Sequence, residues 1–159
     1  MSDYKIFVGQ CARPTTGEWV DAADVDAVGM AVAKYSEDGA IEVFAADAKG
    51  FGSIRAGSIE EMQALAEYLE GSDDAGARLA YAEYTNTTDP ADLEREFEDA
   101  LNGEWQSEEE FAEDLIRQCH NIPAALDFYI DWQKWAHDLF ISDYFSVPAP
   151  RGVYVFRNC

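Results

Sequence analysis

Three aspartates are the residues whose spacing best suits metal-dependent chemistry in this sequence. Asp127, Asp131 and Asp138 lie at offsets of four and seven on one predicted helix, so their carboxylates could share a face and hold a divalent cation. Such helix-surface acids are more often simply solvated, and the sequence has no HExxH helix, EF-hand loop or GxSxG turn. A magnesium-dependent enzyme is therefore an alternative. We expect instead a protein that is not an enzyme and that uses no metal and no cofactor.

Two other segments give weaker chemical signals. Cys119 and His120 are neighbours, but adjacency alone does not pair a nucleophile with a base. Segment 49–55, KGFGSIR, begins like a dinucleotide-binding loop, yet Arg55 stands where the third glycine belongs, which indicates a turn. The three cysteines are spaced too widely for a zinc knuckle, and a reducing compartment suits them.

Charge, rather than a catalytic motif, distinguishes this sequence. Its 159 residues are 48% hydrophobic, enough for a folded core in one domain or in two or three small modules. Against 32 Asp and Glu stand 11 Lys and Arg, which gives a formal net charge of −21. Phosphate backbones and anionic membranes attract cationic proteins, so direct binding to either is disfavoured. No segment resembles a signal peptide or a membrane span, and we expect a cytoplasmic protein.

The negative charge is concentrated in the middle of the chain. Residues 58–114 hold 19 acidic side chains and only two basic ones, Arg78 and Arg95. Residues 1–57 have a net charge of −4, and residues 115–159 are balanced. Halophilic adaptation or general solubility would spread acids over the whole exterior. Because the last third of the chain carries no net charge, we favour a localised acidic surface with a function of its own.

The first 57 residues predict a strand–helix–strand unit. Short apolar patterns place strands at 4–8 and 41–45, and the valine spacing places a helix at 25–35 between them. The stretch 50–57, which contains three glycines, ends this unit.

Two helices are predicted next. Ser58 and Glu61 form a capping box that begins the first of them, and Gly71 is its natural stop. The second covers roughly 75–84 and precedes a linker at 86–88.

Two strongly acidic helices follow. Asp89 as N-cap and Pro90 at the first helical position begin a helix that ends at Gly103. Ser107 and Glu110 make a second capping box for the next helix. The predicted buried stripes are Leu93, Phe97 and Leu101 on the first, and Phe111, Leu115 and Cys119 on the second.

The C-terminal third predicts one long helix and a closing strand. The helix runs from Pro123 to about Phe140, and the strand covers 152–157. Trp132 and Trp135 face different sides of this helix, which indicates an interface as well as a core. The helix residues expected to be buried are Leu126, Ile130 and Leu139.

The acidic side chains exceed what local helix chemistry explains. An acid in a first turn stabilises a helix by about 0.3 to 1 kcal/mol. Like charges one turn apart cost roughly 0.2 to 0.5 kcal/mol, so acids later in the helices, such as Glu96 and Glu113, need another reason. We therefore predict an interaction surface, here called the acidic surface, made of Glu60, Glu61, Glu67, Glu70, Asp73, Asp74, Asp89, Asp92, Glu94, Glu96, Glu98, Asp99, Glu104, Glu108, Glu109, Glu110, Glu113 and Asp114.

An ordered set of short motifs runs through the second half of the chain. It is densest over 93–115, LEREFEDALNGEWQSEEEFAEDL, and an early Gly-x-Trp element stands at 17–19. The set continues through Ile122–Pro123, Tyr129–Asp131, Ala136–Leu139, Asp143–Tyr144 and Gly152–Phe156. Together these motifs resemble the ArdA family of antirestriction proteins, which mimic DNA and inhibit type I restriction–modification enzymes.

The resemblance implies an α+β fold built as an elongated chain of three small modules. It implies an α/β module at 1–57, an acidic helical module at 58–102, and an α/β module at 103–159 that carries a dimer interface. It also implies an origin on a phage or another mobile genetic element, a role in evading host defence, and action in the cytoplasm of a bacterial host.

We therefore expect a homodimer that occupies the DNA-binding groove of the methyltransferase core of a type I restriction–modification enzyme and blocks restriction. Whether modification is blocked as well stays open. Two copies carry a net charge of −42, which matches about 70 Å, or about 21 base pairs, of duplex DNA. A compact globule of that size has a radius of gyration of only about 20 Å, so we expect an extended dimer. The alternative is a general acidic adaptor or chaperone for basic DNA-binding proteins.

Overall fold

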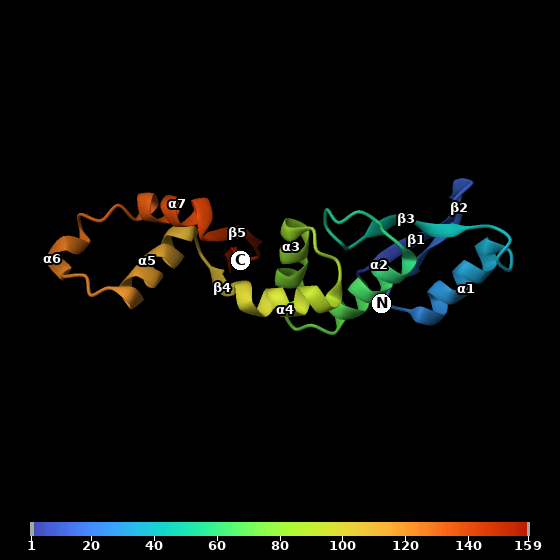
Figure 1. The fold of residues 1–159 in the computed structure, drawn as a ribbon, viewed down its shortest axis with the longest axis horizontal. Coiled ribbons are helices and arrows are strands. Elements are labelled where there is room, and N and C mark those ends of the chain that lie inside the picture. The colour runs from blue at the N-terminus through green and yellow to red at the C-terminus, as the bar shows by residue number, and fades with distance from the viewer. Residues whose placement is uncertain (1, 159) are drawn as a thin grey trace. The chain divides into compact units, whose positions relative to one another are not determined.

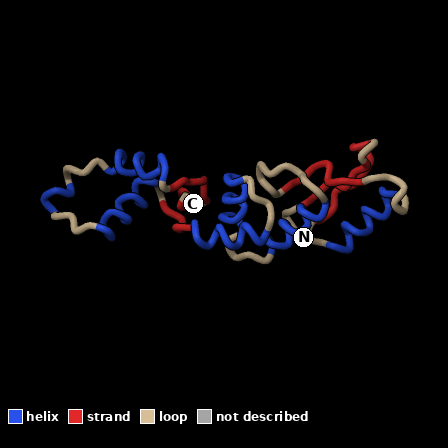
Figure 2. The backbone as a smooth tube through the Cα atoms, in the orientation of Figure 1, coloured by secondary structure: helices blue, strands red, loops and turns tan. Residues whose placement is uncertain are grey.

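The computed structural model describes residues 2–158, which fold as a mixture of helices and strands (Figures 1 and 2). This part of the chain contains seven helices and two three-stranded antiparallel sheets, which confirms the predicted α+β class. None of these helices is long and apolar enough to cross a membrane. The chain divides into two compact units, the N-terminal unit up to Glu94 and the C-terminal unit from Arg95 onward. The finer division at 57/58 and 102/103 stays a prediction.

The N-terminal unit is built on a sheet whose central strand is buried. The sheet comprises β2 (Arg13–Asp21), β1 (Lys5–Gln10) and β3 (Val43–Lys49), in that order and all antiparallel. Ile6 and Val8 of β1 are fully buried. Helix α1 (Val25–Ser36) joins β2 to β3, and Asp24 caps it by accepting a hydrogen bond from the Ala27 N–H at 2.9 Å.

The structure contains a strand, β2, that the predicted strand–helix–strand unit lacks. The prediction of two strands for this unit is therefore wrong. Its residues are exposed up to Thr16 and half-buried beyond, so they show no apolar alternation. Pairing with β1 makes this segment a strand, and the rings of Phe7 and Trp19 meet across the ladder with centroids 5.6 Å apart. A partner strand, rather than a local pattern, determines β2.

The two helices predicted after the sheet are confirmed. Helix α2 (Ile59–Glu70) begins with a complete capping box, because Ser58 and Glu61 each accept the other's backbone N–H at 3.1 Å. Helix α3 (Ala75–Thr85) follows after a short turn. Leu65 and Leu69 of α2 are fully buried, so α2 contributes to the core of this unit.

Helix α4 ends earlier than the sequence predicts. It spans Pro90–Ala100, and the next residue, Leu101, already belongs to β4 (Leu101–Trp105). Leu101 pairs with Phe156 of another strand and is only half-buried. Gly103, expected as the helix stop, lies instead within β4 at φ +92°, where the pairing register shifts.

The C-terminal unit has a sheet of its own. Its order is β4, then β6 (Gly152–Arg157), then β5 (Tyr144–Ala149), and all pairs are antiparallel. Strand β6 is confirmed, whereas β5 was missed. Pro148 lacks an N–H and suits β5 because β5 lies at the edge of the sheet. The core includes Phe97, whose ring centroid lies 5.8 Å from that of Phe156.

The predicted helix over 123–140 is in fact two helices. They are α6 (Ala124–Asp127) and α7 (Trp132–Ser142), which begins where Asp131 accepts a hydrogen bond from the Lys134 N–H. Of its expected core, Leu126 is 56% exposed, while Ile130 and Leu139 are half-buried. The buried residue of α7 is Ala136.

Helix α5 (Glu108–Cys119) differs from the prediction in two details. Cys119, expected to be buried, is exposed at the helix end, and the buried residues are Phe111 and Ala112. Ser107 caps the helix as predicted, but the Glu110 carboxylate accepts from the Gln106 N–H rather than from Ser107. The second hydrogen bond of the predicted capping box is therefore made by the residue before the N-cap, and not by the N-cap residue itself.

We predict that Phe97→Ala destabilises the protein by about 3 to 5 kcal/mol, because it removes a core ring that is 1% exposed. Ile141→Ala is the matched control, since Ile141 is 67% exposed and its loss should change stability by no more than about 0.5 kcal/mol. Urea unfolding of the three proteins measures both. Equal midpoints for the two variants would contradict the central position of Phe97.

Candidate functional site

The acidic surface begins on helix α2, which has one buried and one charged face. Met62, Leu65 and Leu69 are buried, whereas its four glutamates are exposed. Glu61 is engaged in the capping box. The carboxylates of Glu60 and Glu67 make no hydrogen bond or ion pair with any other described residue. This face therefore presents carboxylates whose charge is not neutralised by ion pairs with the described residues of the unit.

Arg78 connects the helices of the N-terminal unit. It lies on α3, is 8% exposed, and its Nη1 donates to the Tyr68 hydroxyl of α2 and to the Glu94 carboxylate of α4, the latter at 2.5 Å. Burial alone would lower the pKa of Arg78, but the hydrogen bonds to Tyr68 and Glu94 outweigh it and raise that pKa. A hydrogen bond with the Tyr68 hydroxyl, together with Arg78, lowers the pKa of Glu94. Glu94 is therefore held in place and ionised.

Helix α4 carries acids on both sides of its buried stripe. Asp89 caps the helix by accepting from the N–H groups of Ala91 and Asp92. Further along, Asp92 and Glu96 are half-exposed, while Glu94, Glu98 and Asp99 are exposed.

The acids of α5 and β4 are positioned mainly by hydrogen bonds. Glu108 accepts from the Ser146 hydroxyl at 2.6 Å, Asp114 from the Gln118 amide at 2.5 Å, and Glu104 from the Arg151 N–H at 2.9 Å. Glu113 accepts two hydrogen bonds from Arg117, at 2.6 and 2.8 Å. These bonds fix the carboxylates and leave most of their charge facing solvent.

Every member of the predicted acidic surface is thus accessible within its own unit. Asp92, Glu96, Glu108, Glu113 and Asp114 are half-exposed, and the other members are exposed. Residues up to Glu94 belong to the N-terminal unit, and the remainder to the C-terminal unit. Their joint function as a single surface stays a prediction.

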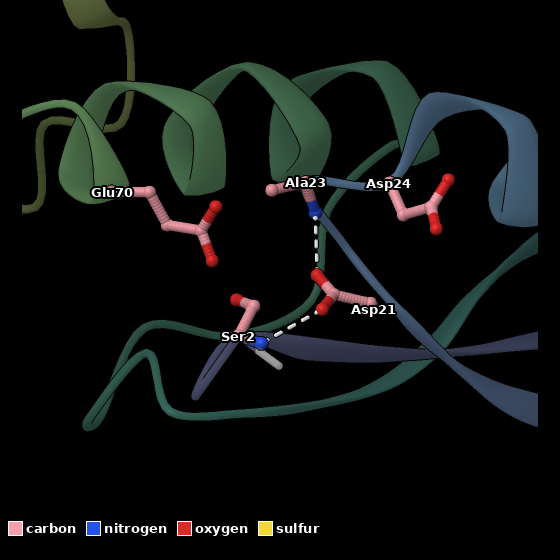
Figure 3. A pocket seen from close by; sticks show the side chains of 5 residues that line it. All are labelled: Ser2, Asp21, Ala23, Asp24 and Glu70. Atoms are coloured by element: carbon pink, nitrogen blue, oxygen red, sulfur yellow. Dashed lines mark hydrogen bonds between the residues drawn. The ribbon is translucent and has the colours of Figure 1, made fainter.

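An acidic pocket in the N-terminal unit was missed by sequence reasoning (Figure 3). Asp21 accepts hydrogen bonds from the Ser2 and Ala23 N–H groups, at 2.9 and 3.1 Å. Burial opposes its ionisation, but these N–H groups outweigh burial and lower the pKa of Asp21. Glu70 of α2 lies across the pocket, and Asp24 lies at its rim. Residues distant in sequence form this pocket, and no local pattern indicates it.

The aspartates proposed as a metal site do not share one helix. Asp127 ends α6 and accepts from Arg117 Nη2 at 2.6 Å, Asp131 caps α7, and Asp138 lies within α7. Among residues 2–158, no group of three or more His, Cys, Asp and Glu side chains is arranged to hold a metal ion. The prediction of one shared helix face is therefore wrong, because residues 128–131 between α6 and α7 are not helical.

The structure also places the two weaker candidates for chemistry, the Cys119–His120 pair and segment 49–55. Cys119 and His120 are both exposed at the end of α5. In the glycine-containing loop, Gly50 and Gly52 have φ of +87° and +59°, and Phe51 between them is buried. The left-handed glycines allow the chain to turn while Phe51 enters the core, which agrees with a structural turn.

Comparison with known families decides the identity of the chain. A family model described as "Antirestriction protein (ArdA)" matches residues 14–153. The chain belongs to the ArdA family. A comparison with curated proteins gave no match. The ArdA family is a family of antirestriction proteins, which are non-catalytic inhibitors directed at restriction enzymes.

We predict that Glu94→Gln removes stability mainly above about pH 5. The lowered pKa of Glu94 means that its ionised form stabilises the folded ArdA chain above the unfolded value, near 4.5, and that this stabilisation is lost as pH falls through the lowered value. The free energy of unfolding of wild type and variant, measured in urea at about pH 7, 5, 4 and 3, should converge at the acidic end.

Glu67→Gln is the matched control, because Glu67 is an exposed glutamate whose carboxylate makes no hydrogen bond or ion pair with another described residue. It should not destabilise the protein at any of these pH values. A gap between wild type and Glu94→Gln that stays constant down to the lowest pH would show that Arg78 and Tyr68 do not stabilise the ionised form.

Proposed function

We propose that this ArdA protein is a DNA mimic that occupies the DNA-binding groove of type I restriction–modification enzymes and blocks restriction. The observation that carries the proposal is the accessible acidic surface on α2, α4, β4 and α5, within a segment of net charge −17. A groove that binds DNA is lined by Lys and Arg that contact phosphates. Carboxylates held on helices offer the same charge to those side chains.

The positioning of the carboxylates supports this proposal. Side chains fixed by caps, by Arg78 and by Arg117 lose little conformational freedom on binding, which favours affinity. Bending a duplex into an enzyme costs on the order of 1 to 6 kcal/mol, a cost that the inhibitor avoids if its surface already follows the groove. Because the surface presents no base sequence, recognition is independent of the target sequence of the enzyme.

A general acidic adaptor for basic DNA-binding proteins is the alternative proposal from the sequence. The two differ in selectivity, because an adaptor binds histone-like proteins and restriction enzymes equally well, whereas an inhibitor of this class prefers the restriction enzyme. Gel-shift competition with labelled duplex provides a further test. A complex that holds inhibitor and duplex together in one groove would refute occupation of the groove.

We predict that neutralising six acids of the acidic surface abolishes inhibition, although a single change such as Glu98→Gln has little effect. Exposed ion pairs contribute no more than about 1 kcal/mol each, so only several losses together release the enzyme. Inhibition of DNA cleavage in vitro and the plating of unmodified phage are the measurements. The six-fold variant combines D92N, E96Q, D99N, E109Q, E113Q and D114N.

The matched control removes the same number of charges from exposed positions outside the acidic surface. It combines D3N, D26N, E37Q, D38N, E42Q and D47N. This variant should inhibit as the wild type does. Equal loss in both variants would mean that total charge, rather than its placement, determines inhibition.

We also propose that the protein acts as an extended homodimer joined through residues 103–159. The predicted result is a scattering mass of two chains and a radius of gyration clearly above the roughly 20 Å of a compact globule of twice 159 residues. Small-angle scattering of the free protein measures both quantities. A mass of one chain would remove the dimer from the proposal, and a radius near 20 Å would remove its extended shape.

A further inference from the structure

One exposed arginine stands among the carboxylates of the acidic surface. Segment 58–114 contains two cations, and Arg78, which bonds to neighbouring helices, is 8% exposed. The side chain of Arg95, on α4, is 69% exposed. Its Nη2 lies 3.6 Å from Oε1 of Glu96, farther than the roughly 2.7 to 2.9 Å of a charge-assisted hydrogen bond. Arg95 is therefore the cation of this segment that an approaching protein meets.

Arg95 lies at the centre of the outward face of α4. Phe97 and Ala100 of the same helix are buried, at 1% and 0% exposure. They follow Arg95 by two and five positions, which on an α-helix correspond to rotations of about 200° and 140°. The Arg95 side chain therefore leaves the helix on the side opposite to the buried stripe.

The helix carries carboxylates on both flanks of this arginine. By the same rotation, Glu98 lies on one flank, and Glu96 and Asp99 lie on the other. A helix with its side chains is about 10 to 12 Å across, close to the roughly 12 Å width of the DNA major groove. The guanidinium of Arg95 therefore stands between two anionic edges, as base edges stand between the two phosphate strands of a duplex.

Base edges offer hydrogen-bond donors that an arginine reproduces. Adenine N6 and cytosine N4 are amino groups in the major groove, and proteins bind them with amide or carboxylate side chains. A guanidinium has five N–H donors in a planar fork whose geometry matches a carboxylate. The Arg95 side chain can therefore bind an acceptor side chain that binds an amino group of DNA.

We propose that Arg95 is a specificity-determining residue of the acidic surface, whose guanidinium pairs with a carboxylate in the DNA-binding groove of the restriction–modification enzyme. The inference rests on the proposed function. Like charges that meet in an interface repel, so an exposed cation turned toward a groove of Lys and Arg weakens binding unless an acid lies opposite it. A carboxylate in the groove supplies that acid.

A purely local role for Arg95 leads to the opposite experimental result. If Arg95 only reduced the repulsion between carboxylates of α4, its loss would destabilise the fold and make the acidic surface more negative. Binding to a cationic groove would then become tighter. If Arg95 pairs with a carboxylate of the enzyme, its loss weakens binding. The sign of the change therefore distinguishes the two roles.

The test compares variants of the full-length chain as competitors of a fluorescent duplex, on a type I enzyme that the wild type inhibits. R95Q should compete roughly ten-fold more weakly, the scale of one lost bidentate pair. R95K keeps the charge but not the planar fork, so its competition should fall between those of R95Q and the wild type. Because R95K keeps the positive charge on α4, it tests the contact even if R95Q does not fold.

R13Q is the matched control, because Arg13 is an exposed arginine outside the acidic surface whose guanidinium makes no hydrogen bond or ion pair with another described residue. It should compete as the wild type does. The deciding step repeats the series on enzymes in which each Asp and Glu of the groove is changed in turn to the amide. On one of them R95Q and the wild type should compete equally, since the guanidinium no longer has a partner.

Three results would overturn the inference. They are competition by folded R95Q that equals or exceeds that of the wild type, competition by R95K that equals it, and a loss in R95Q that persists on every altered enzyme. The first of these would assign Arg95 to the local role on α4. Failure of the wild type to displace the duplex from any type I enzyme would instead refute the proposed function itself.

Discussion

Repulsion between like charges on short helices is the constraint on which the rest of this structure depends. Helices α4 and α5 are 11 and 12 residues long, too short to be stable alone, and carboxylates one turn apart weaken them further. The packing of its inner, apolar face therefore has to stabilise each helix. Leu93 and Phe97 of α4 are buried, and Phe111 of α5 contacts three aromatic rings. Because the inner stripes supply the stability, the outer faces can carry charge.

Two of the cations, Arg78 and Arg117, act where several elements meet. Arg78 bonds α2 and α4 from α3, and Arg117 bonds α5 and α6 while covering a ring of α7. The exposure of the acids could be predicted from their type alone. Their partners could not, because Arg78 and Glu94 are 16 residues apart and meet only when three helices pack. The acidic pocket around Asp21 escaped prediction for the same reason.

Local signals in the sequence predicted the start of helix α2 correctly. Pairing between strands that are distant in the sequence could not be predicted from such signals. The capping pair Ser58 and Glu61 marks the start of α2 because both hydrogen bonds are made within four residues. Leu101 fits the apolar spacing of α4, yet it leaves the helix to pair with Phe156, far along the chain. The apolar spacing typical of a helix continues past Phe128, although the helix itself does not. The spacing therefore gives no sign that a new helix begins after Asp131.

On the proposed function, an effective inhibitor of a DNA-modifying enzyme must satisfy the groove without supplying a substrate. Carboxylates meet the requirement for charge, but a carboxylate on a helix has no phosphodiester bond that a nuclease can cut. A surface of this kind is bound as DNA is bound, and no cleavage releases it.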